Sequence, residues 1–140
     1  MGDGQPETCA FYGAVPLQVD ALELREHGNI GLAFTYNEPL IGYEFVRDTA
    51  RLAKESGLQN VLVTNGTATQ KVLSEISPYI DAMNIDLKAF TDGFYRNFIG
   101  GDFQMVKDFI PTAAKSCHVE LTTLIIPDEN DSEEEMRELS

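Results

Sequence analysis

Cysteine is scarce in this chain of 140 residues. The two cysteines, Cys9 and Cys117, lie far apart in the sequence and match no zinc or iron–sulfur spacing. Cys117 opens an apolar stretch, so we expect a small buried side chain there. Because stable disulfides are rare in the cytoplasm, we expect none between the two cysteines.

Basic residues are also few. Ten Lys and Arg residues stand against 23 Asp and Glu, which gives a formal net charge of −13. Binding to nucleic acid needs clustered Lys and Arg, so this balance argues against a nucleic-acid partner. Acidic residues crowd positions 128–140, where we expect a solvated loop and helix start, with Asp131, Glu133, Glu134 and Glu135 favoured by the helix dipole. An acidic regulatory tail is the alternative.

Long apolar runs are absent as well. No run approaches the roughly 20 residues of a membrane-spanning helix, and residues 1–6 lack the basic and apolar parts of a signal peptide. We therefore expect a cytoplasmic protein that does not bind a membrane. The length suits one domain with an ordinary apolar core.

Short apolar runs alternate with helical patterns along most of the chain. Buried strands are predicted at residues 30–35, 60–64, 82–87 and 119–126. Helices are predicted over residues 42–56, 69–77, 92–98, 103–115 and 133–139. This alternation predicts an α/β fold with about four parallel strands joined by right-handed crossovers.

Local signals refine two of these helices. The inward face of the first should carry Phe45, Val46, Ala50 and Ala53, which recur at helical spacing. Pro111 should kink or divide the helix over residues 103–115, because proline lacks the backbone N–H that a helix interior uses.

The predicted elements read as the middle of a larger fold. Four strands are too few to close a barrel, and the last helix has only begun where the sequence ends. We expect an N-terminal segment, residues 1–27, with a short helix near 17–26, and a core, residues 28–140. The strands at 30–35 and 119–126 would be uncovered edges, so self-association through a sheet edge is expected.

Polar segments follow each predicted strand. They are Thr35-Tyr36-Asn37-Glu38-Pro39, Thr64-Asn65-Gly66, Asp86-Leu87-Lys88 and Thr122-Thr123. Parallel α/β sheets and barrels place their ligands at the carboxyl ends of the strands, so these segments predict a single site built from distant loops. Asp86 and Lys88, two positions apart, should point to the same face. His118, at the amino end of its strand, and His27, before Gly28, are expected to be structural or surface residues.

In order and spacing, these segments resemble the radical S-adenosylmethionine (SAM) superfamily. They look most like enzymes of the pyruvate formate-lyase-activating type, in the subgroup called AmmeMemoRadiSam. The resemblance covers residues 28–140 and implies a partial (β/α) barrel. It also implies that SAM contacts Asn37, Glu38, Thr64, Asn65, Asp86, Leu87, Lys88 and Thr122.

The chain departs from the family pattern at several positions. Tyr36 and Asn37 stand where the family has two glycines before the glutamate, so backbone contacts with SAM are expected to differ. Val63 replaces an aspartate that binds a monovalent cation in some activating enzymes, and Thr122 replaces an arginine of some relatives.

The largest departure concerns iron. Members of the family hold a [4Fe–4S] cluster with a Cys-x-x-x-Cys-x-x-Cys loop, and in activating enzymes the resulting radical attacks a glycine of a partner protein. This chain has no such motif. The resemblance therefore implies an oxidoreductase core that keeps much of the SAM cradle but is inactive alone, with no catalytic residue or metal ligand assigned. Two alternatives stay open, a non-catalytic α/β module that binds a ligand or a polypeptide, and a lyase that uses Lys88 as a Schiff base.

The cysteine count makes a direct prediction. After anaerobic reconstitution with iron and sulfide, the chain should stay colourless and free of iron, because it lacks three convergent thiolates. Iron analysis and visible absorbance measure this. Stoichiometric iron with the charge-transfer bands of a thiolate-bound cluster would show that the ligands have been misidentified.

Overall fold

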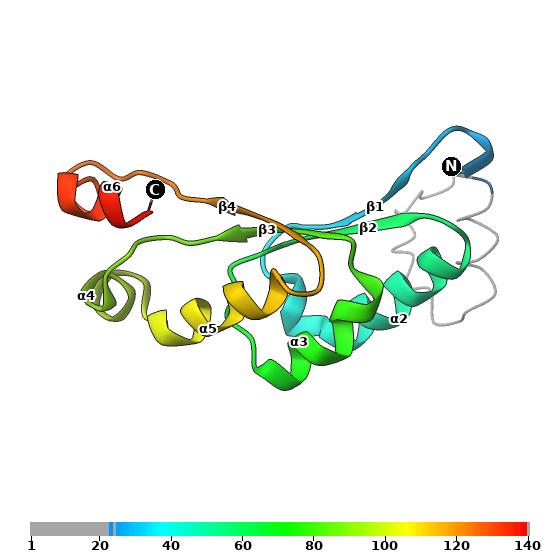
Figure 1. Cartoon of the computed structure of the whole chain (residues 1–140), viewed down its shortest axis with the longest axis horizontal. Helices are drawn as coiled ribbons and strands as arrows, with labels where there is room; N and C mark the ends of the chain where they lie inside the picture. The colour runs from blue at the N-terminus through cyan, green and yellow to red at the C-terminus, as the bar shows by residue number, and fades with distance from the viewer. Residues whose placement is uncertain (1–22, 24, 140) are drawn as a thin grey trace, which may run out of the picture.

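Four parallel strands form an open sheet, and helices from the connections between the strands cover one of its faces (Figure 1). The computed structural model describes residues 23 and 25–139. The helix expected near residues 17–26 falls mostly outside this range, although Glu23, Arg25 and Glu26 are helical. None of the described helices is long and apolar enough to cross a membrane.

The strands lie in the order in which they occur in the sequence. They are β1 (Gly31–Phe34), β2 (Gln59–Thr64), β3 (Ala82–Asp86) and β4 (His118–Thr122). Each pairs in parallel with the next, so β1 and β4 form the edges of the described sheet. The predicted fold class and strand positions are confirmed. β4 ends at Thr122, four residues earlier than predicted.

Helices occupy the connections that the periodicity indicated. They are η1 (Pro39–Gly42), α2 (Tyr43–Glu55), α3 (Gln70–Ile76), η2 (Ser77–Tyr79), α4 (Asp92–Phe94), the π-helical η3 (Tyr95–Ile99), α5 (Phe103–Ala113) and α6 (Glu133–Leu139). Side chains cap the N-termini of several helices. Thr69 caps α3 and Asp102 caps α5, because each accepts a hydrogen bond from the backbone N–H three residues further on. The helix α5 continues through Pro111 to Ala113, so the predicted division does not occur.

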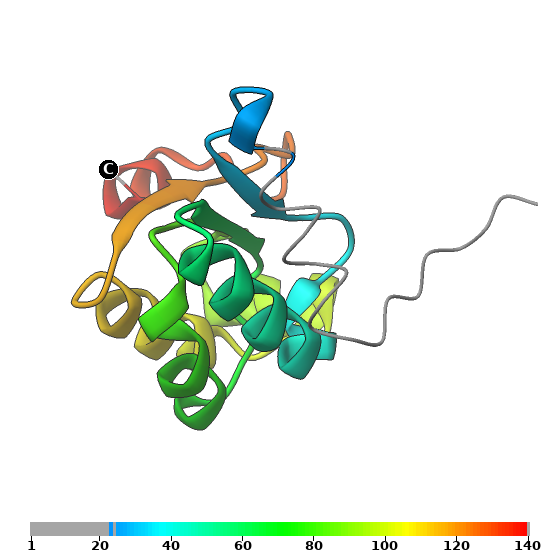
Figure 2. The same ribbon diagram turned by 90° about the vertical axis from the view of Figure 1, so that its right-hand side faces the viewer.

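Helices α2, α3 and α5 all pack on the same side of the sheet (Figures 1 and 2). The main core lies between them and the strands, where Leu62, Ile85, Leu73 and Phe109 are almost fully buried. A second cluster surrounds the carboxyl end of β3. It contains Leu87, Ala89, Phe94, Tyr95, Phe103 and Val106. Through this cluster, α4, η3 and α5 pack against the segment that follows β3.

Two predictions about burial need correction. Val46, Ala50 and Ala53 are buried as expected, but Phe45 is 66% exposed and lines a shallow groove beside β1. Glu135 is not part of a solvated acidic run. It is 6% exposed, and its Oε1 accepts a hydrogen bond of 2.7 Å from the Phe90 N–H, which ties α6 to the segment after β3.

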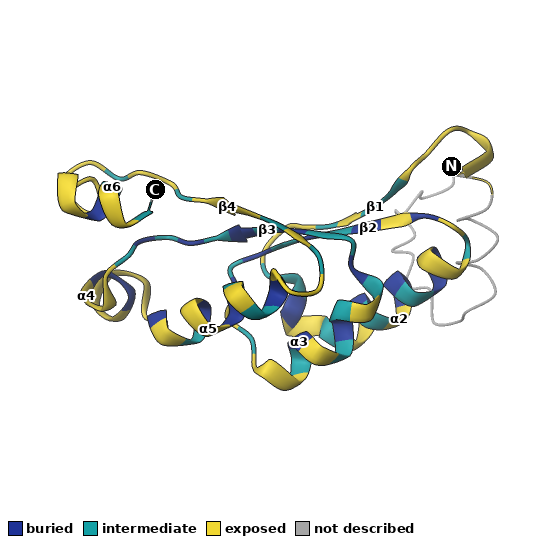
Figure 3. Cartoon of the chain, in the orientation of Figure 1, coloured by how far each residue is buried: buried dark blue, intermediate teal, exposed yellow. Residues whose placement is uncertain are grey.

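The other face of the sheet carries the alternate side chains of each strand. Strand register places Val63, Asn84 and Glu120 in one row, and Asp86 and Thr122 in the next. These side chains are half-buried or exposed, as the colouring of the strands in Figure 3 shows. We call this surface the open face.

Gly66, just after β2, offers a test of the packing around the strand ends. It adopts φ of 71°, and an added Cβ would lie 3.2 Å from Ile85 Cγ2 and 3.3 Å from Val106 Cγ1. Gly66→Ala should therefore lower the free energy of unfolding by about 1–2 kcal/mol or more.

Gly93→Ala is the matched control, because Gly93 lies in a helix with nothing within 4 Å of the added Cβ. It should leave the protein unchanged or stabilise it by about 0.5–1 kcal/mol. Urea unfolding of both variants measures the difference, and equal effects would contradict the described packing.

Candidate functional site at the carboxyl ends of the strands

The polar segments after the strands gather at one end of the sheet, as the parallel pairing requires. Thr64 at the end of β2 pairs with Ile85, and Asp86 at the end of β3 pairs with Thr122. Figure 1 shows the segments after β3 and β4 running on to α4 and α6 at this same end. The strand ends are therefore neighbours in space although they lie far apart in the sequence.

The Glu38 carboxylate joins the loops after β1 and β2. Its Oε1 accepts hydrogen bonds from Leu40 N (3.0 Å) and Thr64 Oγ1 (2.7 Å), and its Oε2 accepts one from Asn65 N (2.7 Å). Thr64 Oγ1 also accepts a bond from Gly66 N, and Thr64 is only 2% exposed. Glu38 and Thr64 were both predicted to contact SAM, but their side-chain oxygens form hydrogen bonds within the protein instead.

The loop before Glu38 has an unusual backbone. Tyr36 and Asn37 adopt φ of 68° and 51°, in the left-handed region that favours glycine. Such a conformation costs about 1–2 kcal/mol for a residue with a Cβ, although asparagine tolerates it better than most. Both side chains are exposed, Tyr36 at 87%. The loop therefore has the backbone conformation that glycine favours, although neither residue is glycine.

Asp86 and Lys88 form an ion pair on the open face. Lys88 Nζ lies 3.2 Å from Asp86 Oδ2, and each side chain is 40% exposed. Leu87, between them, points the other way into the second core cluster and is 3% exposed. Of this predicted segment, the side chains of Asp86 and Lys88 can reach a ligand, whereas Leu87 offers only its backbone.

The surroundings of Lys88 do not favour the lyase alternative. A Schiff-base lysine needs an amine that burial or neighbouring cations keep neutral. Lys88 is instead partly exposed and paired with a carboxylate. No positively charged partner of Lys88 occurs among its contacts in the described part of the chain.

Thr122 and Asn84, from neighbouring rows of the open face, hydrogen-bond to each other. Asn84 Nδ2 donates to Thr122 Oγ1 (2.9 Å), and Thr122 Oγ1 lies 3.0 Å from Asn84 Oδ1. Our sequence reasoning did not select Asn84. The signal was available, because Asn84, Asp86 and Lys88 alternate along a strand and must share a face.

Asn65 and Asn37 differ in how free their amides are. Asn65 Oδ1 accepts a bond from Thr67 N (2.8 Å), which leaves its Nδ2 as a donor. The Asn37 side chain is exposed, next to Glu38, whose carboxylate is hydrogen-bonded to Thr64 and Asn65. The structure thus brings Glu38, Thr64 and Asn65 together, and it joins Asp86 to Lys88 and Thr122 to Asn84.

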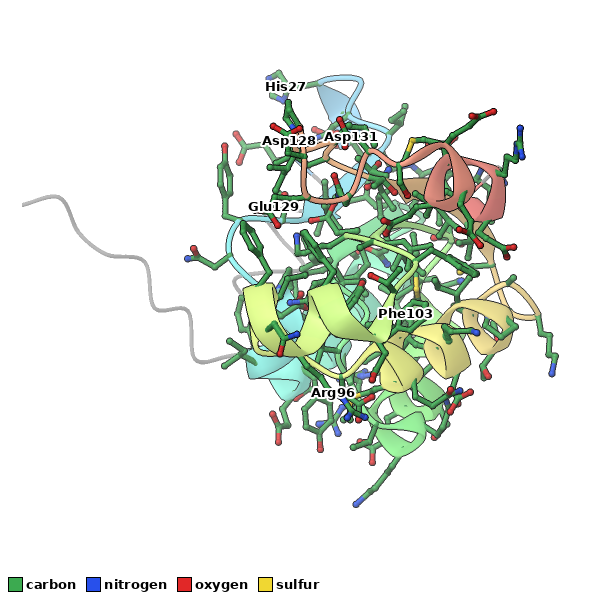
Figure 4. All side chains as sticks on the ribbon, turned by 90° about the vertical axis from the view of Figure 1, so that its left-hand side faces the viewer. His27, Arg96, Phe103, Asp128, Glu129 and Asp131 are labelled. Atoms are coloured by element: carbon green, nitrogen blue, oxygen red, sulfur yellow. The ribbon has the colours of Figure 1, made fainter. Side chains whose placement is uncertain are left out.

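The histidines lie away from this end of the sheet. His118 is the first residue of β4, and His27 precedes β1. Both are exposed, which was expected of His27, whereas His118 was expected to be a structural residue. Figure 4 projects His27 close to Asp128 and Asp131, but Figure 1 shows the two segments at opposite ends of the molecule. No group of three or more His, Cys, Asp or Glu in the described residues is arranged to hold a metal ion.

Cys117 is also remote from the site. It is half-buried just before β4, at the amino end of the sheet, and its Sγ lies 3.6 Å from Ala113 O. Burial, with a smaller effect from the charge of Asp81, raises the pKa of this thiol. Cys9 lies outside the described residues.

The fold and the strand-end loops define an α/β core whose polar side chains gather at the carboxyl edge of a parallel sheet. Residues 17–140 match the sequence profile of the radical SAM superfamily, so the chain belongs to this superfamily. Membership implies SAM and a [4Fe–4S] cluster as cofactors. The donors on the open face suit SAM, but the chain's two cysteines do not fit a cluster that needs three thiolates.

Known proteins extend the comparison. An uncharacterised protein of Methanocaldococcus jannaschii is 37% identical over 128 residues, covering 91% of this chain and 37% of that protein. The pyruvate formate-lyase 1-activating enzyme of Escherichia coli is 27% identical over 112 residues, covering 78% of this chain and 46% of the enzyme. The chain thus spans less than half the length of these relatives.

A solved structure supports the same fold. A domain of pyruvate-formate lyase-activating enzyme from Bacteroides vulgatus superposes with a TM-score of 0.69 at 20% identity, covering 78% of this chain and 68% of that one. At this identity the match shows a shared fold. The expected partial radical SAM barrel architecture is confirmed.

The Glu38 network predicts a stability effect. Glu38→Gln keeps the shape of the side chain but replaces one acceptor oxygen by an NH₂ group, so at least one hydrogen bond to the two loops is lost. The free energy of unfolding should fall by about 1–3 kcal/mol.

Glu129→Gln serves as the control, because Glu129 is exposed in the loop before α6. Its effect should stay within about 0.5 kcal/mol. If urea unfolding gave the same midpoint for both variants and the original protein, Glu38 would not brace the loops.

Proposed function

We propose that this chain is the SAM-binding core of a radical SAM enzyme of the activating type. The proposal depends mainly on the Asp86–Lys88 ion pair, which lies on the open face at the strand ends, beside Asn65 and Thr122. The chain that carries this pair belongs to the radical SAM superfamily. The likeness to a pyruvate formate-lyase 1-activating enzyme supports the assignment of type.

The open face offers partners for the charged groups of SAM. The Lys88 ammonium suits the carboxylate of its methionine part, and the Asp86 carboxylate suits the ribose hydroxyls or the amino group. The Asn37 amide oxygen and the Asn65 NH₂ add an acceptor and a donor from the neighbouring loops. Thr122 contributes a hydroxyl that already bonds with Asn84.

Glu38, Thr64 and Leu87 have a different role in this proposal. Their side chains brace the loops or fill the core, and they act on SAM through the backbone they hold in place. Since the residues of this chain do not fit the [4Fe–4S] cluster, we propose that the chain alone does not catalyse the reaction.

We further propose that the whole enzyme acts on a protein. The relative from Escherichia coli is named for activating another enzyme, pyruvate formate-lyase 1. We also expect the isolated chain to self-associate, because β1 and β4 are unpaired edges of the described sheet.

Calorimetry with SAM tests the proposal. The chain should bind SAM weakly, and Asp86→Asn should reduce the affinity about tenfold or more, because a hydrogen bond to a charged group contributes about 1.5–3 kcal/mol. His118→Gln is the control, since His118 lies at the amino end of β4 and its side chain pairs with that of Glu120, away from the strand ends.

His118→Gln should bind SAM as the original chain does. Equal losses in both variants would indicate general destabilisation and not a site. A folded chain without measurable SAM affinity would overturn the proposal.

A further inference from the structure

The strand-end segment that carries Lys88 lies beyond the sheet. Pairing between β3 and β4 ends at Asp86 and Thr122. Lys88 is two residues further on, and the Leu87 N–H bonds only locally, to Ile85 O at 3.0 Å. Because buried backbone groups need partners, something other than the sheet must hold this segment in its extended course.

Three side chains replace the missing strand pairing. Thr123 Oγ1 donates to Leu87 O (2.6 Å), and the Lys88 N–H donates to the Tyr95 hydroxyl oxygen (3.1 Å). Asn130 Nδ2 donates to Lys88 O (2.7 Å). Each of these backbone groups of Leu87 and Lys88 therefore has a side-chain partner from a different part of the chain. We call Thr123, Tyr95 and Asn130 the Lys88 clamp.

Asn130 connects both segments that leave the sheet. Its Nδ2 also donates to Leu124 O (2.9 Å), and its Oδ1 accepts from Ile126 N (2.6 Å). The side chain is fully buried, at 0% exposed. One amide thus bridges the continuation of β3 and the continuation of β4 where backbone-to-backbone pairing has stopped.

Tyr95 holds the segment from the opposite side. Its ring is buried in the second core cluster with Leu87 and Phe103. Burial raises the pKa of its phenol, with a smaller contribution from the charge of Asp86, so the neutral hydroxyl is the acceptor near neutral pH. The clamp fixes Leu87 inward, and strand alternation then places the Lys88 side chain outward beside Asp86.

We propose that the Lys88 clamp positions the Lys88 ammonium on the open face for binding an anionic group. Thr123, Tyr95 and Asn130 are positioning residues: they act on the ligand through Lys88. The inference rests on the proposed function for the identity of that ligand, the carboxylate of SAM. The positioning itself is a property of the free chain and can be measured without SAM.

Thr123 gives the sharpest variants. Thr123→Val removes the hydroxyl that bonds Leu87 O while keeping the size of the side chain, and Thr123→Ser restores the hydroxyl. Thr112→Val is the matched control, because Thr112 Oγ1 also donates to a backbone carbonyl, Asp108 O at 2.9 Å, but lies on α5 away from the site.

The first readout needs no ligand. Reductive ¹³C-methylation gives Lys88 an NMR signal, which Asp86→Asn assigns and shifts by removing its ionic partner. In Thr123→Val this signal should move toward its position in Asp86→Asn, whereas in Thr123→Ser and Thr112→Val it should stay. An unmoved Lys88 signal in folded Thr123→Val would overturn the clamp, whether or not SAM binds.

The second readout is SAM affinity in a double-mutant cycle. Thr123→Val should weaken binding about fivefold, the equivalent of one ordinary hydrogen bond, and Thr123→Ser should restore it. Adding Thr123→Val to Lys88→Met should cause no further loss, because the clamp acts through Lys88.

Additive losses in that cycle, or equal losses in Thr112→Val, would show a general structural effect and contradict the clamp. If the original chain failed to bind SAM while the NMR signal moved as expected, the proposed function would fail and the clamp would stand.

Discussion

Where a parallel strand ends, its backbone N–H and C=O groups lose their partners in the sheet. This loss determines which side chains are needed at the carboxyl edge of the sheet. Buried N–H and C=O groups left without partners are costly, so side chains must take over. Glu38 does so for the loops after β1 and β2, and Asn130, Thr123 and Tyr95 do so after β3 and β4. The open face that they border keeps its shape because these bonds are made inside the protein.

The same constraint separates two kinds of polar residue at the edge. Glu38 and Thr64 are committed to protein donors, while the half-exposed side chains of Asp86 and Lys88 pair with each other and have no further side-chain partner among the described residues. A ligand can compete for a partly exposed pair more easily than for a buried network, since surface ion pairs contribute little. This division braces the edge from within and still leaves a charged pair exposed to solvent.

Much of the fold could be predicted because its signals are local. Alternating apolar periods gave the strand and helix order, and the spacing of Asp86 and Lys88 placed both on one face. Long-range partners were hidden, however. Nothing near Glu135 in the sequence indicates that it bonds Phe90 N, and nothing near Asn130 indicates that it reaches Lys88 O. Phe45 was predicted inward from its helical spacing alone, and that spacing does not show that its side chain stays exposed beside the edge strand β1.

The central claim is that the carboxyl edge of this sheet binds SAM, and amide NMR during a SAM titration tests it most directly. We expect shifts concentrated at Asn37, Asn65, Lys88 and Thr122, with His118 unaffected. The main competing place is a cavity of about 640 Å³ on the helical side, lined in part by Ser77, Asp81 and Ser116. Shifts centred on that cavity, or none at all, would contradict SAM binding at the carboxyl edge.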